Sequence, residues 1–252
     1  MHVRRILAPN PGPFTGAGTN TYLVASGGAC LVIDPGPEDD RHLAAIVNAV
    51  AGSRPVGILV THFHFDHLGL AEQLSAFLAV PVSVPGTIKG FRTLSDGEAI
   101  EVGEERLVSM HTPGHTAEHT CFVAEDQLFA GDLLKGDSTV VIEDLAAYLD
   151  SLARVVRLPL RVIYPGHGDA ITDPVAVVSA TIAHRLARHQ QITASVESGA
   201  STLEEIVEAI YPDLEPLLRP VAVQSVLAHL RQLAVDGRVR LSEAGAVSVE
   251  SA

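Results

Sequence analysis

The feature that most constrains this chain is a cluster of histidines directly after a short apolar run. Residues 61–70 read THFHFDHLGL, which places His62, His64, Asp66 and His67 within six positions. Imidazole and carboxylate groups are common protein ligands for zinc and similar divalent metals. A metal loop of this kind needs further ligands from elsewhere in the chain. The rest of the sequence therefore decides between a metal site and a helix start that is merely rich in histidine.

The spacing within this loop suits two metals. On an extended loop His62 and His64 project to the same side, because side chains alternate with a period of two. Asp66 and His67 then face a second metal where the chain turns into the following helix. Asp66 also suits a helix N-cap, and either histidine taken alone is more often an ordinary surface or core residue. The four together favour the metal loop.

Three more potential ligands follow predicted strands further along the chain. His115 stands in the Pro-Gly turn of HTPGHT, Asp132 ends the segment FAGD, and His167 ends YPGH. Loops at strand ends are where open α/β architectures place their sites. A carboxylate such as that of Asp132 can bridge two cations. The sequence thus offers seven nitrogen or oxygen ligands in positions that can meet.

The order of predicted elements indicates an α/β fold. Apolar, β-branched runs at 19–26, 29–36 and 56–60 read as strands, and the run at 41–50 reads as an amphipathic helix. Strands and helices interleaved in this way favour layered α/β packing. We expect this core to occupy residues 1–175.

The remaining sequence has a different pattern. Residues 176–198 predict one long connecting helix. Residues 199–252 begin with a Ser/Thr cap and an acidic first turn, continue with a second amphipathic helix that ends at Gly237, and finish with two short strands around a glycine turn. This order predicts a small winged-helix-like C-terminal domain.

Taken together, these motifs resemble the metallo-β-lactamase superfamily. The resemblance rests on H-x-H-x-D-H at 62–67, Pro-Gly-His at 113–115, Gly-Asp at 131–132 and Pro-Gly-His at 165–167. It implies an αββα sandwich of two sheets with helices outside. It also implies one metal held by His62, His64 and His115, and a second held by Asp66, His67 and His167, with Asp132 bridging the two.

The same resemblance gives roles to residues around the metals. It implies that Asp34 supports the metal loop from beneath, although a turn before Pro35 explains this aspartate nearly as well. His119 is expected to support the site or to pack in the core. His111, His184 and His189 are not expected to be ligands.

The implied chemistry is that of a dinuclear hydrolase. Two zinc ions about 3.5–4 Å apart generate hydroxide near neutral pH and polarise a carbonyl or phosphoryl oxygen. Asp66 is the candidate catalytic residue that orients the nucleophile or carries its proton. Iron and manganese suit the same ligands, so zinc is an expectation that does not exclude them.

Over nearly its whole length the chain resembles the β-lactamase-like protein 2 group, through NPGPFTGAGTNTYLV, GDLLKGDSTVVIEDLAAYLDSL and AHRLARHQQI. That group carries a C-terminal winged helix. An animal relative is a single-strand-selective endoribonuclease, and related enzymes are thioesterases that release polyketides from acyl carrier proteins. The implied substrate is a small molecule, a thioester or other ester, or a phosphodiester such as single-stranded RNA. The possible substrate contacts are Lys135, Ser138, Thr139 and Arg185.

Charge argues against binding to duplex DNA. The net charge is −13, and residues 199–252 hold four arginines, no lysine and eight acidic residues. A broad basic surface, which holds nucleic acid by charge, is therefore not expected. A metal-dependent regulator that binds nucleic acid through the winged module is the non-enzymatic alternative.

No secretory signal or apolar run of membrane-spanning length is evident, so we expect a cytoplasmic protein without a membrane partner. The two cysteines, Cys30 and Cys121, are too few for a disulfide framework and lie in strand-like runs. We expect both to pack in the core. The sequence leaves the oligomeric state open.

Overall fold

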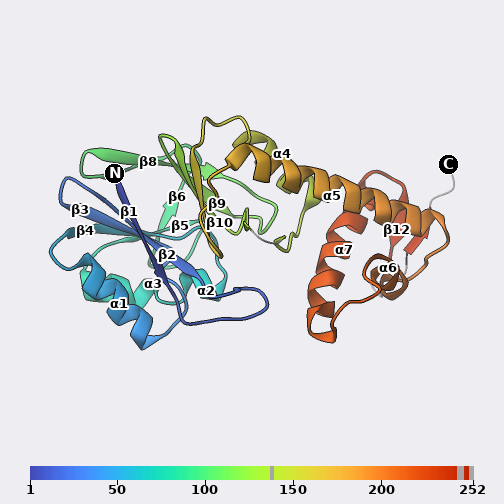
Figure 1. Ribbon diagram of the computed structural model, residues 1–252, viewed down its shortest axis with the longest axis horizontal. Coiled ribbons are helices and arrows are strands. Elements are labelled where there is room, and N and C mark those ends of the chain that lie inside the picture. Colours follow the sequence, from blue (N-terminus) through green and yellow to red (C-terminus); the bar gives the residue numbers. More distant parts are fainter. Residues whose placement is uncertain (137–138, 243–246, 250–252) are drawn as a thin grey trace.

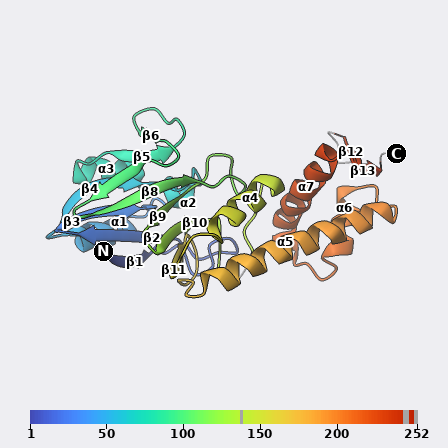
Figure 2. The same ribbon diagram turned by 90° about the horizontal axis from the view of Figure 1, so that it is seen from above.

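Two β-sheets lie face to face in the N-terminal part of the chain, with helices on both outer sides (Figures 1 and 2). The computed structural model describes residues 1–136, 139–242 and 247–249. The predicted αββα layering is confirmed. A smaller module lies beyond one end of the sandwich and is joined to it by a long helix.

The first sheet contains six strands, paired in their order along the chain. These are β1 (His2–Leu7), β2 (Asn20–Ser26), β3 (Ala29–Ile33), β4 (Arg54–Leu59), β5 (Val82–Pro85) and β6 (Arg92–Leu94). Its first three strands are antiparallel, whereas β3 to β6 are parallel. Its helices are α1 (Asp40–Val50), the single turn α2 (Phe65–Leu68) and α3 (Ala71–Leu78).

The second sheet has five strands in the order β11-β10-β9-β8-β7. They are β7 (Ala99–Val102), β8 (Glu105–His111), β9 (Thr120–Ala124), β10 (Gln127–Gly131) and β11 (Val162–Pro165). All pairs are antiparallel except β10 with β11, which the helix α4 (Leu145–Val155) connects as a crossover. The parallel pair places the ends of β10 and β11 at the same edge.

The alternation of side chains along the strands divides the sandwich core into layers. In β2, Tyr22 and Val24 enter the layer between the sheets, while Leu23 enters the layer under α1 and α3. In the second sheet, Phe129 of β10 faces the first sheet and Leu128 faces α4. Because both faces are covered, the central residues of these strands are apolar, as the sequence indicates.

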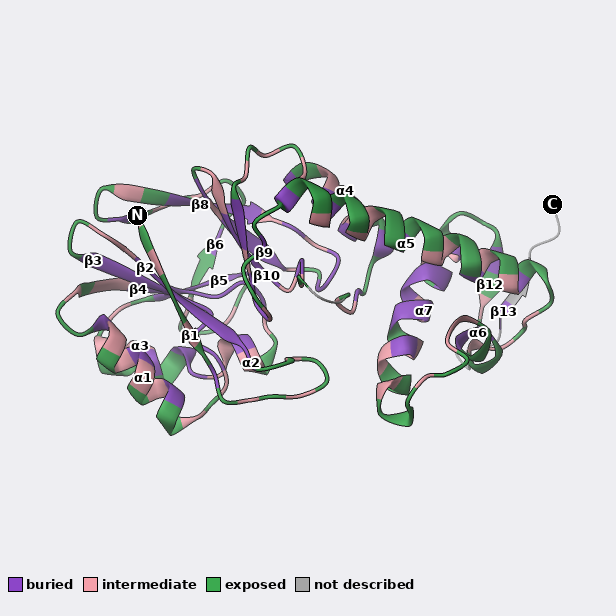
Figure 3. Ribbon diagram, viewed as in Figure 1, coloured by how far each residue is buried: buried purple, intermediate pink, exposed green. Residues whose placement is uncertain are grey.

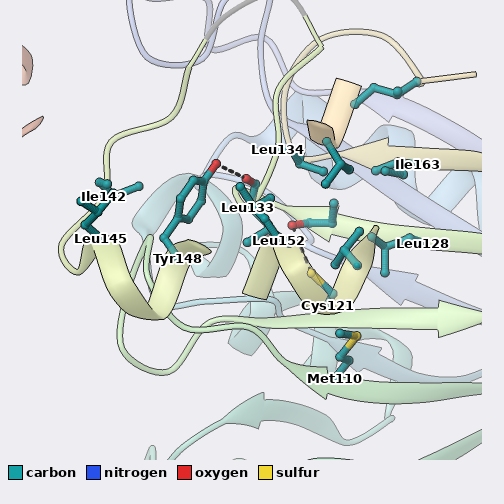
Figure 4. Close-up of a cluster of buried hydrophobic side chains, with 14 of the residues drawn as sticks. Met110, Cys121, Leu128, Leu133, Leu134, Ile142, Leu145, Tyr148, Leu152 and Ile163 are labelled. Atoms are coloured by element: carbon teal, nitrogen blue, oxygen red, sulfur yellow. Dashed lines mark hydrogen bonds between the residues drawn. The ribbon is translucent and has the colours of Figure 1, made fainter. Parts of the chain in front are cut away.

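The outer layer of the second sheet is built around α4 (Figure 4). Tyr148 of α4 is fully buried and donates a hydrogen bond from its hydroxyl to the carbonyl oxygen of Leu133, at 2.7 Å. Cys121 belongs to the same cluster, and Cys30 is buried under the first sheet. Both cysteines are free thiols in the core, as predicted.

The long helix α5 (Pro174–Glu197) leaves the sandwich and carries the C-terminal module (Figure 1). The module contains α6 (Leu203–Ile210), the 3-10 turn η1 (Pro216–Leu218), α7 (Arg219–Val235) and the hairpin of β12 (Val239–Leu241) and β13 (Val247–Val249). The predicted cap of α6 is confirmed, because Thr202 and Glu205 form a reciprocal capping box.

The module has its own apolar core, to which the last turns of α5 contribute Ile192 and Val196. Figure 3 shows the buried face of α7 turned toward α5, while much of α5 is exposed. Helix α5 is thus both a connector and part of the module. In the described part of the chain, no helix combines the length and apolar character that crossing a membrane requires.

Candidate active site and metal centre

The seven predicted ligands meet at one end of the sandwich. His62, His64, Asp66 and His67 lie in the loop after β4 and in the turn α2. His115 follows β8, Asp132 follows β10 and His167 follows β11. Strands from both sheets therefore deliver the donors, which explains why residues 100 positions apart lie in contact.

One group of donors consists of His62, His64, His115 and Asp132, whose ligand atoms all lie within 4.8 Å of one another. Nδ1 of His64 lies 3.0 Å from Nε2 of His62 and 3.1 Å from Nε2 of His115. Four donors this close form a site that can hold a metal ion.

A second group consists of Asp66, His67 and His167, also within 4.8 Å. Asp132, a member of the first group, also lies close to the second. Its Oδ1 atom is 3.5 Å from Nε2 of His67 and 3.4 Å from Nε2 of His167, while its Oδ2 atom is 3.7 Å from Nε2 of His115. One carboxylate thus faces both groups, as a bridging ligand must.

The outward nitrogens of two of these histidines, His115 and His167, are hydrogen-bonded to backbone carbonyl oxygens. Nδ1 of His115 donates to the carbonyl oxygen of Val141 at 2.6 Å, and Nδ1 of His167 donates to that of Gly18 at 3.2 Å. Because a carbonyl only accepts, Nδ1 carries the hydrogen in both rings. Nε2, which points into the cluster, is then the nitrogen that would offer its lone pair to a metal.

Asp34 fixes two further rings from beneath. Its Oδ2 atom accepts from Nδ1 of His67 at 2.8 Å and from the hydroxyl of Thr61 at 2.8 Å. Since Thr61 donates to Asp34, its oxygen accepts from Nδ1 of His62, at 3.0 Å. Asp34 has a left-handed backbone (φ 49°), which is uncommon for a residue other than glycine. This is the contact that the expected supporting role needs.

The charges of the cluster favour cation binding. Burial alone would lower the pKa of His67, but the carboxylates of Asp132 and Asp34 raise it well above its ordinary value. Burial likewise opposes the charged form of His167, and hydrogen bonds to Asp132 and Asp66 raise its pKa to about 9. Two histidines therefore hold protons where the carboxylates attract positive charge. A metal cation would satisfy the same attraction and release those protons.

Gly166 has no side chain, and the donor cluster occupies the space that a side chain would fill. A Cβ atom at this position would lie 2.6 Å from Oδ1 of Asp132 and 2.6 Å from Cε1 of His67. Any larger residue would therefore push into the space between these two donors. The donor set, the direction of its lone pairs and this glycine all fit a bound metal pair.

Comparison with known proteins identifies the family. The model of the metallo-β-lactamase superfamily matches residues 14–92 and 83–167, and that of the β-lactamase-associated winged helix domain matches residues 202–246. The chain belongs to the metallo-β-lactamase superfamily. The superfamily is one of metal-binding hydrolases, and the candidate centre lies within the matched part.

Similar proteins cover nearly the whole chain. The β-lactamase-like protein 2 homolog of Caenorhabditis elegans is 33% identical, across 94% of this chain and 85% of its own length. An atrochrysone carboxyl ACP thioesterase of Aspergillus chevalieri is also 33% identical, across 97% of this chain and 85% of its own. A metallo-β-lactamase family protein from Thermus thermophilus superposes with a TM-score of 0.83, at 25% identity and 98% coverage of both chains.

In this metallo-β-lactamase superfamily member, a cavity of 670 Å³ opens onto the donors. His64, Asp66, His115, Asp132 and His167 form its floor. Lys135 and Thr139, two predicted substrate contacts, line its wall. Ser138, a third, lies outside the described residues.

Other walls of the cavity were not predicted from the sequence. Phe14 comes from the loop before β2, and Leu218 and Val221 come from η1 and α7 of the module. Phe14 lies in the segment NPGPFTG, which carries the family resemblance but was not predicted to line a site. For Leu218 and Val221 the sequence holds no signal, because only the fold brings the module to the cavity.

Arg185 is placed differently from the phosphate contact expected of it. It is 1% exposed, does not line the cavity, and donates from its guanidinium to the carbonyl oxygen of Val140. A guanidinium enclosed in this way presents no surface to a substrate phosphate in this structure. Arg185 instead lies behind the cavity wall.

The other histidines stay outside the two donor groups. His119 is buried behind His62, with ring centroids 5.3 Å apart, and its Nδ1 atom bonds to the hydroxyl of Thr112. His111 bonds to the carbonyl oxygen of Ala117. His189 lies on α5 beside His229 of α7, with 3.3 Å between their Nδ1 atoms.

Proposed function

We propose that this chain is a dinuclear metallohydrolase that cleaves ester or thioester bonds. The observation that supports it is the convergence of seven donors in two groups, with one carboxylate between them. His62, His64 and His115 would hold one metal, Asp66, His67 and His167 the other, and Asp132 both. Zinc suits these nitrogen and oxygen ligands.

When bound, such a metal pair supplies a nucleophile at neutral pH and a Lewis acid for the substrate carbonyl. Asp66 is held in place to accept the proton that the attacking water gives up. The Thr19 hydroxyl donates to Oδ2 of Asp66 at 3.1 Å, and the side chain of Asn10 holds Thr19 from both its hydroxyl and its amide. Burial opposes ionisation of Asp66, but His167 and His67 lower its pKa to about 2. Its carboxylate therefore accepts a hydrogen bond from an attacking water at neutral pH.

The cavity walls favour an acyl substrate over a nucleic acid. Phe14, Val140, Val141, Leu218 and Val221 present apolar surface to the space above the donors. Lys135 is the one lysine or arginine among the described lining residues. A polynucleotide would need several cations or stacking aromatics along its path. An acyl group needs an apolar wall, and the similarity to a named thioesterase supports the same class.

A hydrolase screen with protein of measured metal content tests the proposal. We expect about two metal ions per chain and hydrolysis of acyl thioesters and aryl esters in preference to single-stranded RNA, bis-aryl phosphodiesters, lactones and β-lactams. Asp132→Ala is expected to lose both metal and activity. His184→Ala, at an exposed position on α5, is the matched control and should retain both.

Three outcomes would count against it. Full activity in metal-free protein or in Asp132→Ala would rule out the metal mechanism. Cleavage of single-stranded RNA without thioesterase activity would reject the acyl substrate and favour phosphodiester chemistry. Salt-sensitive binding of duplex DNA without hydrolysis, measured by gel shift, would instead favour the regulator hypothesis.

A further inference from the structure

A buried arginine on the connecting helix contacts the segments that orient two of the proposed metal ligands. Arg185 lies in the middle of α5 and is 1% exposed. Its guanidinium carbon is 5.3 Å from the centroid of the Tyr148 ring. In the described part of the chain, no carboxylate lies within ion-pair distance of it, and its Nε atom has no hydrogen-bond partner.

The first connection leads to His115. One guanidinium nitrogen of Arg185 donates to the carbonyl oxygen of Val140. The next carbonyl along the chain, that of Val141, accepts the Nδ1 hydrogen of His115 at 2.6 Å. Arg185 thus holds the short segment whose carbonyl sets both the ring orientation and the tautomer of His115.

The second connection leads to Asp132. The guanidinium of Arg185 also packs over the side chain of Tyr148, which ends in a buried hydroxyl. That hydroxyl donates to the carbonyl oxygen of Leu133 at 2.7 Å, as Figure 4 shows. Leu133 directly follows Asp132, so the contact fixes the turn from which the bridging carboxylate projects.

Retaining this arginine has a cost that packing alone does not explain. A charge buried without an opposite charge is destabilising by several kcal/mol unless hydrogen bonds compensate. An apolar side chain of similar length would fill the same space without that cost. The hydrogen bond to Val140 and the packing over Tyr148 link this arginine to both carbonyl segments at once, and an apolar residue would supply no such hydrogen bond.

We propose that Arg185 is a positioning residue for His115 and Asp132, and that it couples the position of helix α5 to the geometry of the metal centre. The inference rests on the proposed function, because it concerns ligands of the proposed metal pair. Groups that orient metal ligands from behind commonly change metal affinity by about 10–100-fold when removed. Since Arg185 acts through two intervening residues on each side, we expect about tenfold.

The test measures metal binding apart from turnover. Full-length wild type, Arg185→Met, Arg185→Lys and Tyr148→Phe are stripped of metal and titrated with Co²⁺ and Zn²⁺ against a chelator. We expect Arg185→Met to bind about tenfold more weakly and to show a changed Co²⁺ visible spectrum. Arg185→Lys retains one donor toward Val140 and is expected to recover part of the affinity. Tyr148→Phe breaks only the Leu133 connection and should show a smaller change.

Arg188→Met is the matched control. Arg188 lies one turn further along α5 and packs over the ring of Tyr211, 4.5 Å from its centroid, within the module. We expect Arg188→Met to leave the Co²⁺ spectrum and affinity unchanged. Urea unfolding of each metal-free variant separates lost stability from altered ligand geometry.

The possible outcomes separate the two proposals. If the wild type binds no metal, the proposed function fails and this inference fails with it. If the wild type binds two metals and Arg185→Met matches it in affinity and spectrum, only the positioning role is overturned. An equal change in Arg188→Met would also overturn it, because the effect would then be a general one of α5. If Arg185→Met does not fold, Arg185→Lys and Tyr148→Phe decide by the same criteria.

Discussion

The carboxylate of Asp34 lies 2.8 Å from Nδ1 of His67 and accepts two further hydrogen bonds from the amide and hydroxyl of Thr61. This buried aspartate belongs to neither donor group. It nevertheless fixes the ring of His67 directly and the ring of His62 through Thr61. Strand β3, which ends at Ile33, thereby sets the geometry of a loop that follows β4.

Asp34→Asn should weaken metal binding by about 10–100-fold, since an amide cannot accept from Thr61 and His67 as a carboxylate does. Chelator competition measures the affinity. Asp40→Asn, an exposed aspartate in the first turn of α1, is the control and should be silent. Wild-type affinity in Asp34→Asn would show that the contact does not orient the ring.

Gly166→Ala places a methyl group 2.6 Å from both Oδ1 of Asp132 and Cε1 of His67, so these ligands must move. We expect loss of at least one metal ion, measured by elemental analysis, and a fall in kcat/KM of about 100-fold or more. At Gly136 the nearest atoms to an added Cβ are 3.5 Å away, an ordinary contact. Gly136→Ala should therefore behave as the wild type. Equal losses of metal and activity in the two variants would show that crowding of the donors at Gly166 is not the cause.

Leu218→Ser should reduce the enzyme's preference for long acyl chains. Leu218 lines the cavity, whereas its neighbour Leu217 is 69% exposed and does not. Replacing one apolar wall contact changes discrimination between acyl lengths by about tenfold, as one or two methylenes do. A series of acyl thioesters of increasing length measures KM and kcat. Short substrates should be unaffected, Leu217→Ser should resemble the wild type, and equal loss for all lengths would remove Leu218 from the acyl site.

The module should lose stability in mild acid because of His229. Burial, with the nearby charges of Arg185 and His189, lowers the pKa of this histidine to about 3, against about 6.5 in an unfolded chain. Below pH 6.5 the unfolded chain therefore binds a proton that the folded chain does not, and stability falls as the pH drops toward 3. Between pH 7.5 and 5.5, His229 therefore lowers the free energy of unfolding by about 1.4 kcal/mol.

Urea unfolding of metal-free wild type and His229→Gln at pH 7.5 and 5.5 measures this loss of unfolding free energy. Chelator in every sample removes the effect of metal loss, and the other histidines contribute equally to both proteins. The variant should lose less stability between the two pH values. Equal losses would show that His229 is protonated at no cost in the folded chain.

The donors were predictable because their signals are local. The spacing of His62, His64, Asp66 and His67 is read within one loop, and His115, Asp132 and His167 each follow a recognisable strand and turn. The layered fold was predictable from the alternation of apolar strands and helices, together with the family resemblance. The assignment of each donor to a particular metal stays a prediction, as do the domain boundaries at residues 175 and 199.

The surroundings of the donors depend on packing between distant segments, and local patterns carry no information about that. Arg185 stands between His184 and Leu186 in the sequence context of an ordinary exposed helical arginine, yet it is buried against Tyr148. Leu218 stands two residues after Pro216, in a module whose sequence reads as separate from the core. Its place in the cavity wall depends on how α5 directs the module back toward the sandwich.

The pairing of β10 with β11 also sets an order of assembly. His62, His64, His115 and Asp132 have all been synthesised by residue 132, whereas His167 follows the crossover through α4 and the last strand of the sheet. A chain made from its N-terminus therefore contains one complete group of donors while the other still lacks a member. If the chain holds two metals as proposed, the His115 group is the first whose ligands have all been made, and the second group is closed only when the sheet itself is finished.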